Sequence, residues 1–565
     1  MRHCCMDGTD PAAVFFDFAA AFPSLSHEYL HAVLEHLGIP ASFRHLVKAL
    51  YEGNGCTIAT AGGSFAGFSI RAGIRQGCPL SPLLFAVCGD LLVRRLRSAC
   101  PESLVRAYAD DLAVVTRKWR AMLTAARPVF DDFAAASGLF LNLGKTVFIP
   151  LGDDNVDTFR RDLGVVCPGW GGALVQMQAE YLGFTLGPEA GDKGWTNAFA
   201  KARLRARLWS SLGLGLHLTA VAYETYISSV LGFLLQLEVL PSSWPELEAA
   251  IFRNLVPSPG YWIMPKDLHI LKDHLGMPKS FADMKEISLA ARFRVAHREA
   301  SANRGLRAER HAQALDRAFA NSEHVIRTSR RRAWLLDSAY HRLQAAVSAY
   351  RVLGFTVQDV EKDLGANGPR PYTRQQIRRL SRGLQAGCRK RIAAAKRAPP
   401  EGRMREKLSI WRVQLFPRLR VTRALEVLKR LRRLVPPRVV AATLRTWFNG
   451  WCTARRFQGR DSCFFGCRLG EDSVHHYLRC VRLQDFGTAR LRLPSEERPE
   501  ARTLAALMLQ PGSSMNDEVF TRRALLVAAA YRLHCTHRHG RPVRRCGGPS
   551  PSLGAGGEAG GPGAY

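Results

Sequence analysis

The 565-residue sequence lacks an apolar run long enough to span a membrane. The longest candidate, residues 227–240, is interrupted by Gln236 and Glu238. The first residues, Met1 to Cys5, do not resemble a secretory signal. The 14 cysteines are scattered and form no dense disulfide pattern, which indicates a reducing compartment. The sequence therefore predicts a protein that is neither a helical membrane protein nor a small disulfide-stabilised domain.

Acidic residues are also scarce. The chain has 48 Asp and Glu against 80 Lys and Arg, a net charge of +32 at pH 7. Such an excess predicts a polyanionic partner, and nucleic acid suits it better than a membrane surface. The length is enough for three or four domains with a large core, and the hydrophobic content of 47% is ordinary for globular protein.

Two adjacent carboxylates, Asp110 and Asp111, interrupt an apolar run that extends from Val105 to Val115. The pattern predicts a buried β-hairpin with both carboxylates at its tip. Desolvating them is costly unless a positive charge lies beside them, and Mg²⁺ is the natural partner. The alternative for the dipeptide alone is a solvated turn.

A further carboxylate, Asp17, lies in the apolar segment of residues 14–22. Because a lone carboxylate in an apolar strand is costly, we interpret Asp17 as a ligand. Pairing of this strand with the hairpin would bring Asp17 beside Asp110. Two such carboxylates can hold two Mg²⁺ ions, which activate an attacking 3′-hydroxyl and stabilise a leaving pyrophosphate.

Between these segments lies a Gly- and Pro-containing loop, residues 73–82, which precedes an apolar helix over residues 83–96. Glycine permits a close approach of the backbone to a ligand, and proline fixes the start of the helix. The loop is therefore expected to lie against a base pair.

Five segments in this order resemble the conserved motifs of reverse transcriptases. They are F-D-F-x-x-A-F around Asp17, R-Q-G-C-P-L-S-P from Arg75, Y-A-D-D from Tyr108, residues 138–146 and residues 180–184. The sequence R-Q-G-C-P-L-S-P is most similar to the corresponding motif of non-LTR (LINE-type) retrotransposons. One such motif alone would be weak evidence for the resemblance, but five motifs in the same order are strong evidence. The resemblance covers residues 11–187.

The resemblance implies a role for each matching residue. It makes Asp17 and Asp110 the magnesium ligands, with the Phe18 carbonyl as a further ligand and Asp111 as an accessory carboxylate. Lys145 would protonate the leaving pyrophosphate, although a solvated lysine is an alternative. Phe22 would exclude ribonucleotides by a clash at the sugar 2′-position; its alternative is a core phenylalanine. The residues expected at the nucleotide, template or primer are Arg75, Gln76, Gly77, Tyr108 and Tyr181.

Downstream segments are helical and basic. In the family's order, residues 195–214 would begin the thumb, which grips the template–primer duplex. Between Pro371 and Val440 there are 21 Lys and Arg against 3 Asp and Glu. Missing counter-charges favour phosphate contacts over a solvated face. The basic residues of one expected helix are Arg423, Lys429, Arg430, Arg432 and Arg433.

Three cysteines and a histidine follow at metal-binding spacing. Cys463, Cys467, His475 and Cys480 would hold one structural Zn²⁺, and they resemble the zinc knuckle downstream of the polymerase in non-LTR elements. His475 is preferred because it leaves an H-x₄-C gap to Cys480, with His476 as the alternative fourth ligand. Buried free thiols are the other interpretation. Nearby arginines suggest nucleic-acid contact: Arg455, Arg456, Arg460 and Arg468. The later cluster of His534, Cys535, His537, His539 and Cys546 has irregular spacing and is interpreted as incidental.

The expected fold is therefore α+β: a right-hand polymerase palm, then a helical thumb, a basic helical region and a small zinc module. The expected domains are residues 1–190, 191–320, 321–450, 451–500, 501–540 (a C-terminal helix) and 541–565 (a disordered tail). Only sixteen residues precede Asp17, so we expect a piece of a longer element protein without its complete fingers or endonuclease. The expected activity is RNA-directed DNA polymerisation with dNTPs, an RNA template and a DNA primer. An inactive nucleic-acid-binding relic and an intron-maturase-type enzyme are the alternatives. The resemblance implies an intracellular, nuclear location.

Overall fold

A computed structural model of the chain describes residues 9–152, 155–257, 262–301, 353–354, 357–365, 373–396, 400–411, 417–510 and 516–538. The expected tail of residues 541–565 and all of residues 302–352 lie outside the described residues. The chain divides into two compact units: residues 1–201, 230–242 and 284–396, and residues 202–229, 243–283 and 397–565. None of the described helices is long and apolar enough to cross a membrane.

A five-stranded sheet organises the N-terminal part of the first unit. Its strand order is β4-β5-β1-β6-β7, with β1 antiparallel to both neighbours and only β6 and β7 parallel. Every residue of the central strand β1 is buried, as expected for an apolar strand with neighbours on both sides. The strand bounds are Ala12–Phe16 (β1), Leu104–Tyr108 (β4), Asp111–Thr116 (β5), Val147–Pro150 (β6) and Leu174–Val175 (β7).

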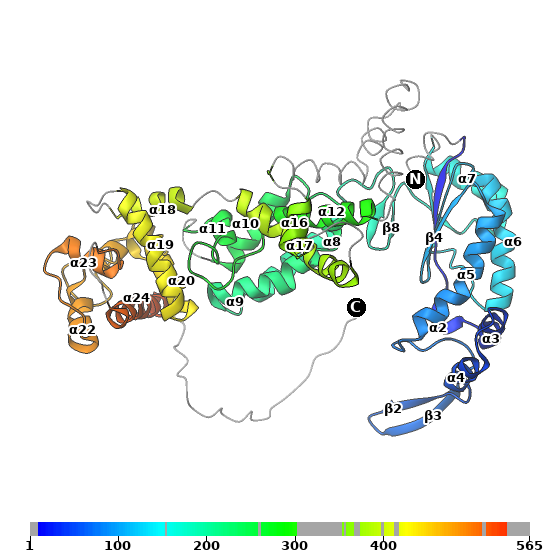
Figure 1. Cartoon of the computed structure of the whole chain (residues 1–565), viewed down its shortest axis with the longest axis horizontal. Coiled ribbons are helices and arrows are strands. Elements are labelled where there is room, and N and C mark those ends of the chain that lie inside the picture. Colours follow the sequence, from blue (N-terminus) through cyan, green and yellow to red (C-terminus); the bar gives the residue numbers. More distant parts are fainter. Residues whose placement is uncertain are drawn as a thin grey trace. The chain divides into compact units, whose positions relative to one another are not determined.

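The two faces of this sheet bury alternate residues of β1, β5 and β6. Val14, Phe16 and Val114 belong to one core cluster, which includes residues of helices α5 (Ser81–Ala99) and α6 (Trp119–Ser137). Phe15 and Val115 belong to a second cluster on the other face, where the short hairpin of β8 (Ala179–Tyr181) and β9 (Phe184–Leu186) packs. Figure 1 shows α5 and α6 alongside the sheet. The expected α+β palm architecture is confirmed.

The first strand does not extend over the whole apolar segment of residues 14–22. It ends at Phe16, and Ala20 adopts a left-handed backbone conformation (φ 48°) immediately before helix α2, Ala21–Ser24. The chain therefore turns away from the strand at Ala20, after residues 17–19 have made backbone contacts with residues 140–142. Likewise β6 starts at Val147 because residues 143–145 form a turn. The next helices are α3 (His27–His36), α4 (Ala41–Tyr51), α7 (Val156–Val166) and the 3₁₀ turn η1 (Pro168–Trp170).

A two-stranded hairpin extends beyond α4 (Figure 1). Strands β2 (Gly55–Thr60) and β3 (Gly63–Ser69) pair with each other and with no further strand of the described residues, and nearly all their residues are exposed. Phe65 and Phe68 are 56% and 67% exposed. The apolar side chains of this hairpin thus lack a covering layer among the described residues.

Helices account for the regular structure of the remaining described residues in the first unit. Phe293 of α12 (Met284–Ser301), Val360 of α16 (Val357–Asp363) and Leu384 of α17 (Arg374–Lys396) share a small core. On α17, Cys388 and Ile392 repeat at helical spacing and complete this core. Helix α8 (Trp195–Ser210) follows the β8–β9 hairpin and runs into the second unit.

Helices joined by turns and loops make up the described residues of the second unit, apart from an isolated bridge between Ser462 and Glu471. A buried ion pair organises its middle: Arg403 donates from Nε and Nη2 to the carboxylate of Asp267, which is 1% exposed. The helix bounds are Gly215–Ala222 (α9), Trp244–Leu255 (α10), Pro265–His269 (α11), Pro400–Ser409 (α18), Pro417–Leu434 (α19), Pro437–Trp447 (α20), Val474–Tyr477 (α21), Val481–Leu491 (α22), Pro499–Ala506 (α23) and Asp517–Arg538 (α24), with a π-helical turn at Tyr223–Ile227.

Candidate active site and metal centre

Three carboxylates meet at one edge of the palm sheet. In the register of β1 and β5, Phe16 lies opposite Leu112, so the next pair outward is Asp17 and Asp111. Tyr108 pairs with Asp111, which leaves Ala109 and Asp110 as the two-residue turn of the β4–β5 hairpin. The sequence prediction that the Asp17 strand lies beside the Asp110 hairpin is confirmed.

The carboxylates affect one another electrostatically. Burial raises the pKa of Asp111, and the negative charges of Asp110 and Asp17 raise it further. A cation between them would relieve this repulsion, so the donor set suits a divalent metal ion. The assignment of individual ligands stays a prediction.

Backbone contacts fix the position of Asp17. Its carbonyl oxygen accepts a 2.8 Å hydrogen bond from the N–H of Asn142, and its own N–H donates to Thr146 Oγ1 at 3.5 Å. Phe18 forms an isolated antiparallel bridge with Leu141, so its backbone continues along this edge. Lys145 is exposed in the turn that Asn142 begins, with its N–H bonded to the Asn142 carbonyl at 3.1 Å. The structure thus ties the Lys145 turn to the end of the Asp17 strand.

The tyrosines take different positions around this edge. Tyr181 of β8 stacks on Phe15, with ring centroids 4.9 Å apart, and its hydroxyl donates to the Asp111 carbonyl at 3.5 Å. The β8–β9 hairpin therefore supports the carboxylate edge from the sheet face opposite α5 and α6. Tyr108, in contrast, is 69% exposed. An exposed ring at the hairpin tip is available to a ligand, as expected for a residue near the primer.

Phe22 is half-buried and stacks on Phe85 of α5, with centroids 4.8 Å apart and an interplanar angle of 7°. Its carbonyl accepts the N–H of Ile74 at 2.8 Å. Gly73 adopts φ +89°, and a Cβ there would lie 2.5 Å from the Pro23 carbonyl oxygen. Only glycine allows this close approach, which holds the 73–82 loop beside α2.

The loop exposes the remaining substrate candidates. Gln76 and Gly77 are exposed, while Arg75 donates to Asn54 Oδ1 at 2.5 Å. Sequence reasoning did not single out Cys78, which lies just before α5. Backbone N–H groups of Leu80 and Ser81 lower the pKa of the Cys78 thiol, against the opposing effect of burial. Cys78, which lies beside the expected nucleotide site, therefore has a more acidic thiol than an ordinary cysteine.

The second unit contains a four-residue cluster suited to a metal ion. One ligand atom from each of Cys463, Cys467, His476 and Cys480 lies within 4.8 Å of all the others. The sulfurs of Cys463 and Cys480 are 3.8 Å apart, and Cys467 Sγ lies 3.1 Å from His476 Nε2. Tetrahedral zinc with Zn–S bonds of about 2.3 Å requires sulfurs about 3.8 Å apart. The donor set and the spacing both fit zinc.

The preference for His475 as the fourth member of this cluster is wrong. The His475 ring packs against Trp411, with centroids 4.7 Å apart, whereas His476 faces the cysteines. The Ser473 side chain caps α21 by accepting the His476 N–H, and this sets which side of the helix each histidine occupies. Gly470 makes room, because a Cβ there would lie 2.2 Å from His476 Nδ1.

A buried carboxylate, Asp472, links this cluster to the last helix. Its oxygens accept hydrogen bonds from the Ala454 N–H at 2.8 Å, from the Tyr477 hydroxyl and from His534 Nε2 at 2.9 Å. Burial alone would raise the pKa of Asp472, but these donors outweigh it and hold the pKa below its usual range. His534 belonged to a group interpreted as incidental; the structure gives it a structural contact, and sequence spacing offered no signal because 62 residues separate the pair.

The predicted phosphate-binding arginines fall into two groups. Arg423 pairs with Glu426, Arg430 with Asp517, and Arg455 with Glu471. Arg456 donates to the Asn449 carbonyl. The second group is exposed and makes no such ion pair or hydrogen bond within the described residues: Lys429, Arg433, Arg460 and Arg468. The basic surface available to a polyanion is therefore smaller than the sequence count implies.

Comparison with known proteins agrees with the palm geometry. Residues 2–186 match the family described as reverse transcriptase (RNA-dependent DNA polymerase). The Pol polyprotein of the type-2 retrotransposable element R2DM of Drosophila melanogaster is 36% identical over 135 residues, 23% of this chain and 13% of that protein. A Pol polyprotein from the type-1 retrotransposable element R2 of Popillia japonica is 30% identical over 145 residues, 24% of this chain and 20% of that protein.

A further relative is an uncharacterised 149 kDa protein of the transposon TX1 of Xenopus laevis, 28% identical over 187 residues, 31% of this chain and 14% of that protein. The matches thus span a fifth or less of the length of these relatives. All of them are proteins of mobile elements, and the family match ends where the β8–β9 hairpin ends. The sequence of residues 2–186 is therefore similar to the reverse transcriptase family, and the relatives that it matches come from retrotransposable elements and a transposon.

Proposed function

We propose that the chain is an RNA-directed DNA polymerase of a non-LTR retroelement, which extends a DNA primer on an RNA template. The observation that carries the proposal is the meeting of Asp17, Asp110 and Asp111 at one sheet edge, in a domain of the reverse transcriptase family. Because this edge concentrates negative charge, it suits the divalent cations that nucleotidyl transfer requires. Two bound Mg²⁺ ions would supply activation of the 3′-hydroxyl and neutralisation of the leaving pyrophosphate.

The protein's own residues would orient the reactants. Asp17 and Asp110 would hold the metal ions, and Asp111 would adjust the charge beside them. The exposed Gln76 and Gly77 would contact the nascent base pair, and Phe22 would face the sugar. Lys145, on the turn bonded to the Asp17 backbone, would give a proton to the pyrophosphate. Transfer of the nucleotidyl group then depends on positioning and charge neutralisation more than on covalent help.

The second unit would add affinity for nucleic acid. A zinc ion bound by Cys463, Cys467, His476 and Cys480 would order the segment that presents Arg460 and Arg468. Exposed lysine and arginine side chains of α19 would contact phosphates. Residues from 195 onward, where α8 begins, would serve as the thumb. This arrangement explains a net charge of +32 in a chain whose palm needs a polyanionic substrate.

The test is primer extension by the full chain, with a labelled DNA primer annealed to an RNA template, dNTPs and Mg²⁺. The parent should add nucleotides only when Mg²⁺ is present. Asp17→Asn and Asp110→Asn should each lower the rate by about 10³-fold or more, since metal clamping supplies much of the barrier reduction. Asp131→Asn, an exposed carboxylate of α6, is the matched control and should stay within about twofold of the parent.

Two outcomes would overturn this proposal. The first is a parent chain that binds the primed template yet adds no nucleotide, which would leave nucleic-acid binding as its function. The second is an Asp110→Asn rate within about tenfold of the parent, because the loss of a metal ligand exceeds that.

A further inference from the structure

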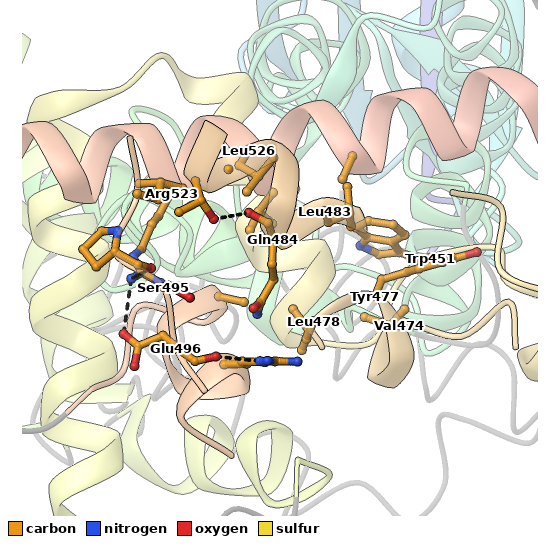
Figure 2. A pocket seen from close by; sticks show the side chains of 18 residues that line it. Trp451, Val474, Tyr477, Leu478, Leu483, Gln484, Ser495, Glu496, Arg523 and Leu526 are labelled. Carbon is orange, nitrogen blue, oxygen red and sulfur yellow. Dashed lines mark hydrogen bonds and ion pairs between the residues drawn. The ribbon is translucent and has the colours of Figure 1, made fainter. Parts of the chain in front are cut away.

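Buried polar side chains of this chain have different surroundings. In the second unit, Arg523 is 8% exposed and lies beside a cavity of about 70 Å³ between α21, α22, α23 and α24 (Figure 2). Its Nη2 lies 3.4 Å from Glu496 Oε1 and 3.5 Å from the Pro494 carbonyl oxygen. The cavity has room for water but is far smaller than small-molecule sites, so Arg523 contributes to packing. Thr146 of the palm differs, because its hydroxyl contacts the backbone of a candidate metal ligand.

The Thr146 side chain is 0% exposed and lies immediately before β6. Its hydroxyl donates to the Asn142 carbonyl oxygen at 2.9 Å and accepts the Asp17 N–H at 3.5 Å. The same Asn142 carbonyl accepts the backbone N–H groups of Lys145 and Thr146, at 3.1 and 2.9 Å. One hydroxyl therefore connects the Asp17 backbone to the turn that carries Lys145.

This hydroxyl lies at an interruption of the palm sheet. The ladder between β1 and β6 is regular as far as the pair of Phe15 and Val147. Beyond that pair the chain leaves the ladder in the turn of residues 143–145, and pairing resumes at the bridge that Phe18 forms. At the interruption, the Asp17 N–H donates to the threonine hydroxyl in place of a backbone carbonyl. The side chain of Thr146 therefore completes a strand that the turn would otherwise leave open.

The backbone of Asp17 determines where its carboxylate lies. Phe16 and Phe18, on either side of it, belong to the core on the α5 and α6 face, as does Leu112 beside Asp111. Because successive side chains of an extended chain point to opposite faces, Asp17 and Asp111 share the other face. A displacement of the Asp17 backbone would move its carboxylate relative to the other two, and a misplacement of about 1 Å can cost about 10²-fold in rate.

We propose that Thr146 is a positioning residue for nucleotidyl transfer, whose hydroxyl holds the Asp17 backbone at the place where Asp17 and Asp110 bind the same pair of cations. The inference rests on the proposed function, since it takes Asp17 as a metal ligand. Groups that orient a metal ligand typically contribute about 10–100-fold to metal affinity or activity. Loss of this hydroxyl should therefore weaken metal binding and slow nucleotide addition, while recognition of the dNTP is unchanged.

The first measurement is Mn²⁺ binding by the full chain, followed by electron paramagnetic resonance without nucleic acid or dNTPs. Asp17→Asn identifies the part of the binding that belongs to the palm. Thr146→Val keeps the shape of the side chain but removes the hydroxyl, and it should raise the dissociation constant for this Mn²⁺ about tenfold. Thr146→Ser keeps the hydroxyl and should stay within about threefold of the parent.

Thr116→Val is the matched control. Thr116 is 2% exposed, its hydroxyl contacts the Lys118 backbone, and it lies at the end of β5 remote from the carboxylates, opposite Ala12. This variant loses a buried hydroxyl of the same domain and should bind Mn²⁺ as the parent does. A merely structural role of Thr146 would lower the melting temperature of both valine variants without changing Mn²⁺ binding in either.

The second measurement is single-nucleotide primer extension with the same proteins. Thr146→Val should lower kcat about tenfold and should need more Mg²⁺ for its half-maximal rate. Its KM for the dNTP should stay within about twofold of the parent, because the substituted group does not contact the nucleotide. Thr146→Ser should restore most of the rate.

The inference would be overturned by a Thr146→Val protein that binds Mn²⁺ within about twofold of the parent, or by a Thr146→Ser protein as impaired as Thr146→Val. If circular dichroism shows that Thr146→Val is not folded, Thr146→Ala replaces it under the same criteria. The two proposals fail differently. A parent that adds no nucleotide rejects the polymerase proposal, whereas an active parent with an unaffected Thr146→Val protein rejects only the role of Thr146.

Discussion

His534 Nε2 lies 2.9 Å from Asp472 Oδ1, and both side chains are at least 95% buried. This contact joins helix α24 to the loop that precedes α21, where the cluster histidine lies. Within the second unit, α24 and the loop before α21 are therefore connected through one carboxylate. The same carboxylate accepts hydrogen bonds from the Tyr477 hydroxyl and the Ala454 N–H. Four consequences of the structure can be measured.

Asp472→Ala should destabilise the C-terminal unit by about 3 kcal/mol, because it leaves several buried donors without an acceptor. The measurement is urea unfolding followed by tryptophan fluorescence, for which Trp451 beside Tyr477 is a local probe. Asp485→Ala, at an exposed position of α22, should change the midpoint little. Equal unfolding midpoints for the two variants would mean that Asp472 contributes no net stability.

Zinc content should distinguish the two histidines. The reduced parent chain should bind about one zinc per molecule, His475→Ala should keep it, and His476→Ala and Cys467→Ser should lose most of it, since a structural site needs its complete ligand set. The check is metal analysis after dialysis under reducing conditions. Retention of zinc by His476→Ala with loss in His475→Ala would contradict the ligand set that the structure assembles.

Phe22→Ala should relax sugar discrimination. Removing the ring relieves a clash with the 2′-hydroxyl, so incorporation of ribonucleotides relative to deoxyribonucleotides should rise about tenfold. The measurement is single-nucleotide primer extension with each substrate. Because Phe22 also stacks on Phe85, Phe85→Leu is the control for lost packing alone and should leave the ratio unchanged. A ratio that moves equally in both variants would assign Phe22 to the core.

Replacing Asp111 by asparagine should raise the stability of the palm without metal but weaken its stabilisation by Mg²⁺. Its pKa in the folded protein is raised by burial and by Asp110 and Asp17, so its ionisation destabilises the palm at neutral pH. That penalty is absent below the ordinary value of 3.8, where both states are protonated, and appears as the pH rises through the folded-state pKa.

At pH 7 without metal, Asp111→Asn should therefore raise the melting temperature slightly, by about 1–2 °C. Added Mg²⁺ should stabilise the parent more than the variant, since the parent has more repulsion to relieve. Thermal scanning with and without Mg²⁺ measures both effects. A variant that melts below the parent at pH 7 in the absence of metal would contradict the electrostatic account.

Prediction from the sequence succeeded for elements whose residue pattern is compatible with a single local structure. The apolar residues around Val14 predicted a strand, and the carboxylates of Asp17 and Asp110 predicted that this strand lies beside the hairpin, because a charge in an apolar strand needs a partner. The left-handed turn at Ala20 escaped prediction, since alanine has no preference for that conformation. The choice between His475 and His476 depended on where α21 begins, and one residue along a helix rotates a side chain by about 100°. The pair of Asp472 and His534 depends on packing between distant segments, which spacing does not encode.

The β2–β3 hairpin has a consequence for handling the protein. Within the part of the chain that the structure describes, its two strands leave an unpaired row of backbone N–H and C=O groups along each outer edge, and its apolar side chains are exposed. A two-stranded hairpin alone is only marginally stable in water. Another strand that joins either edge gains main-chain hydrogen bonds and covers Phe65 and Phe68 at once. The open edges and the two exposed phenylalanines therefore favour association between copies of the chain in concentrated solution.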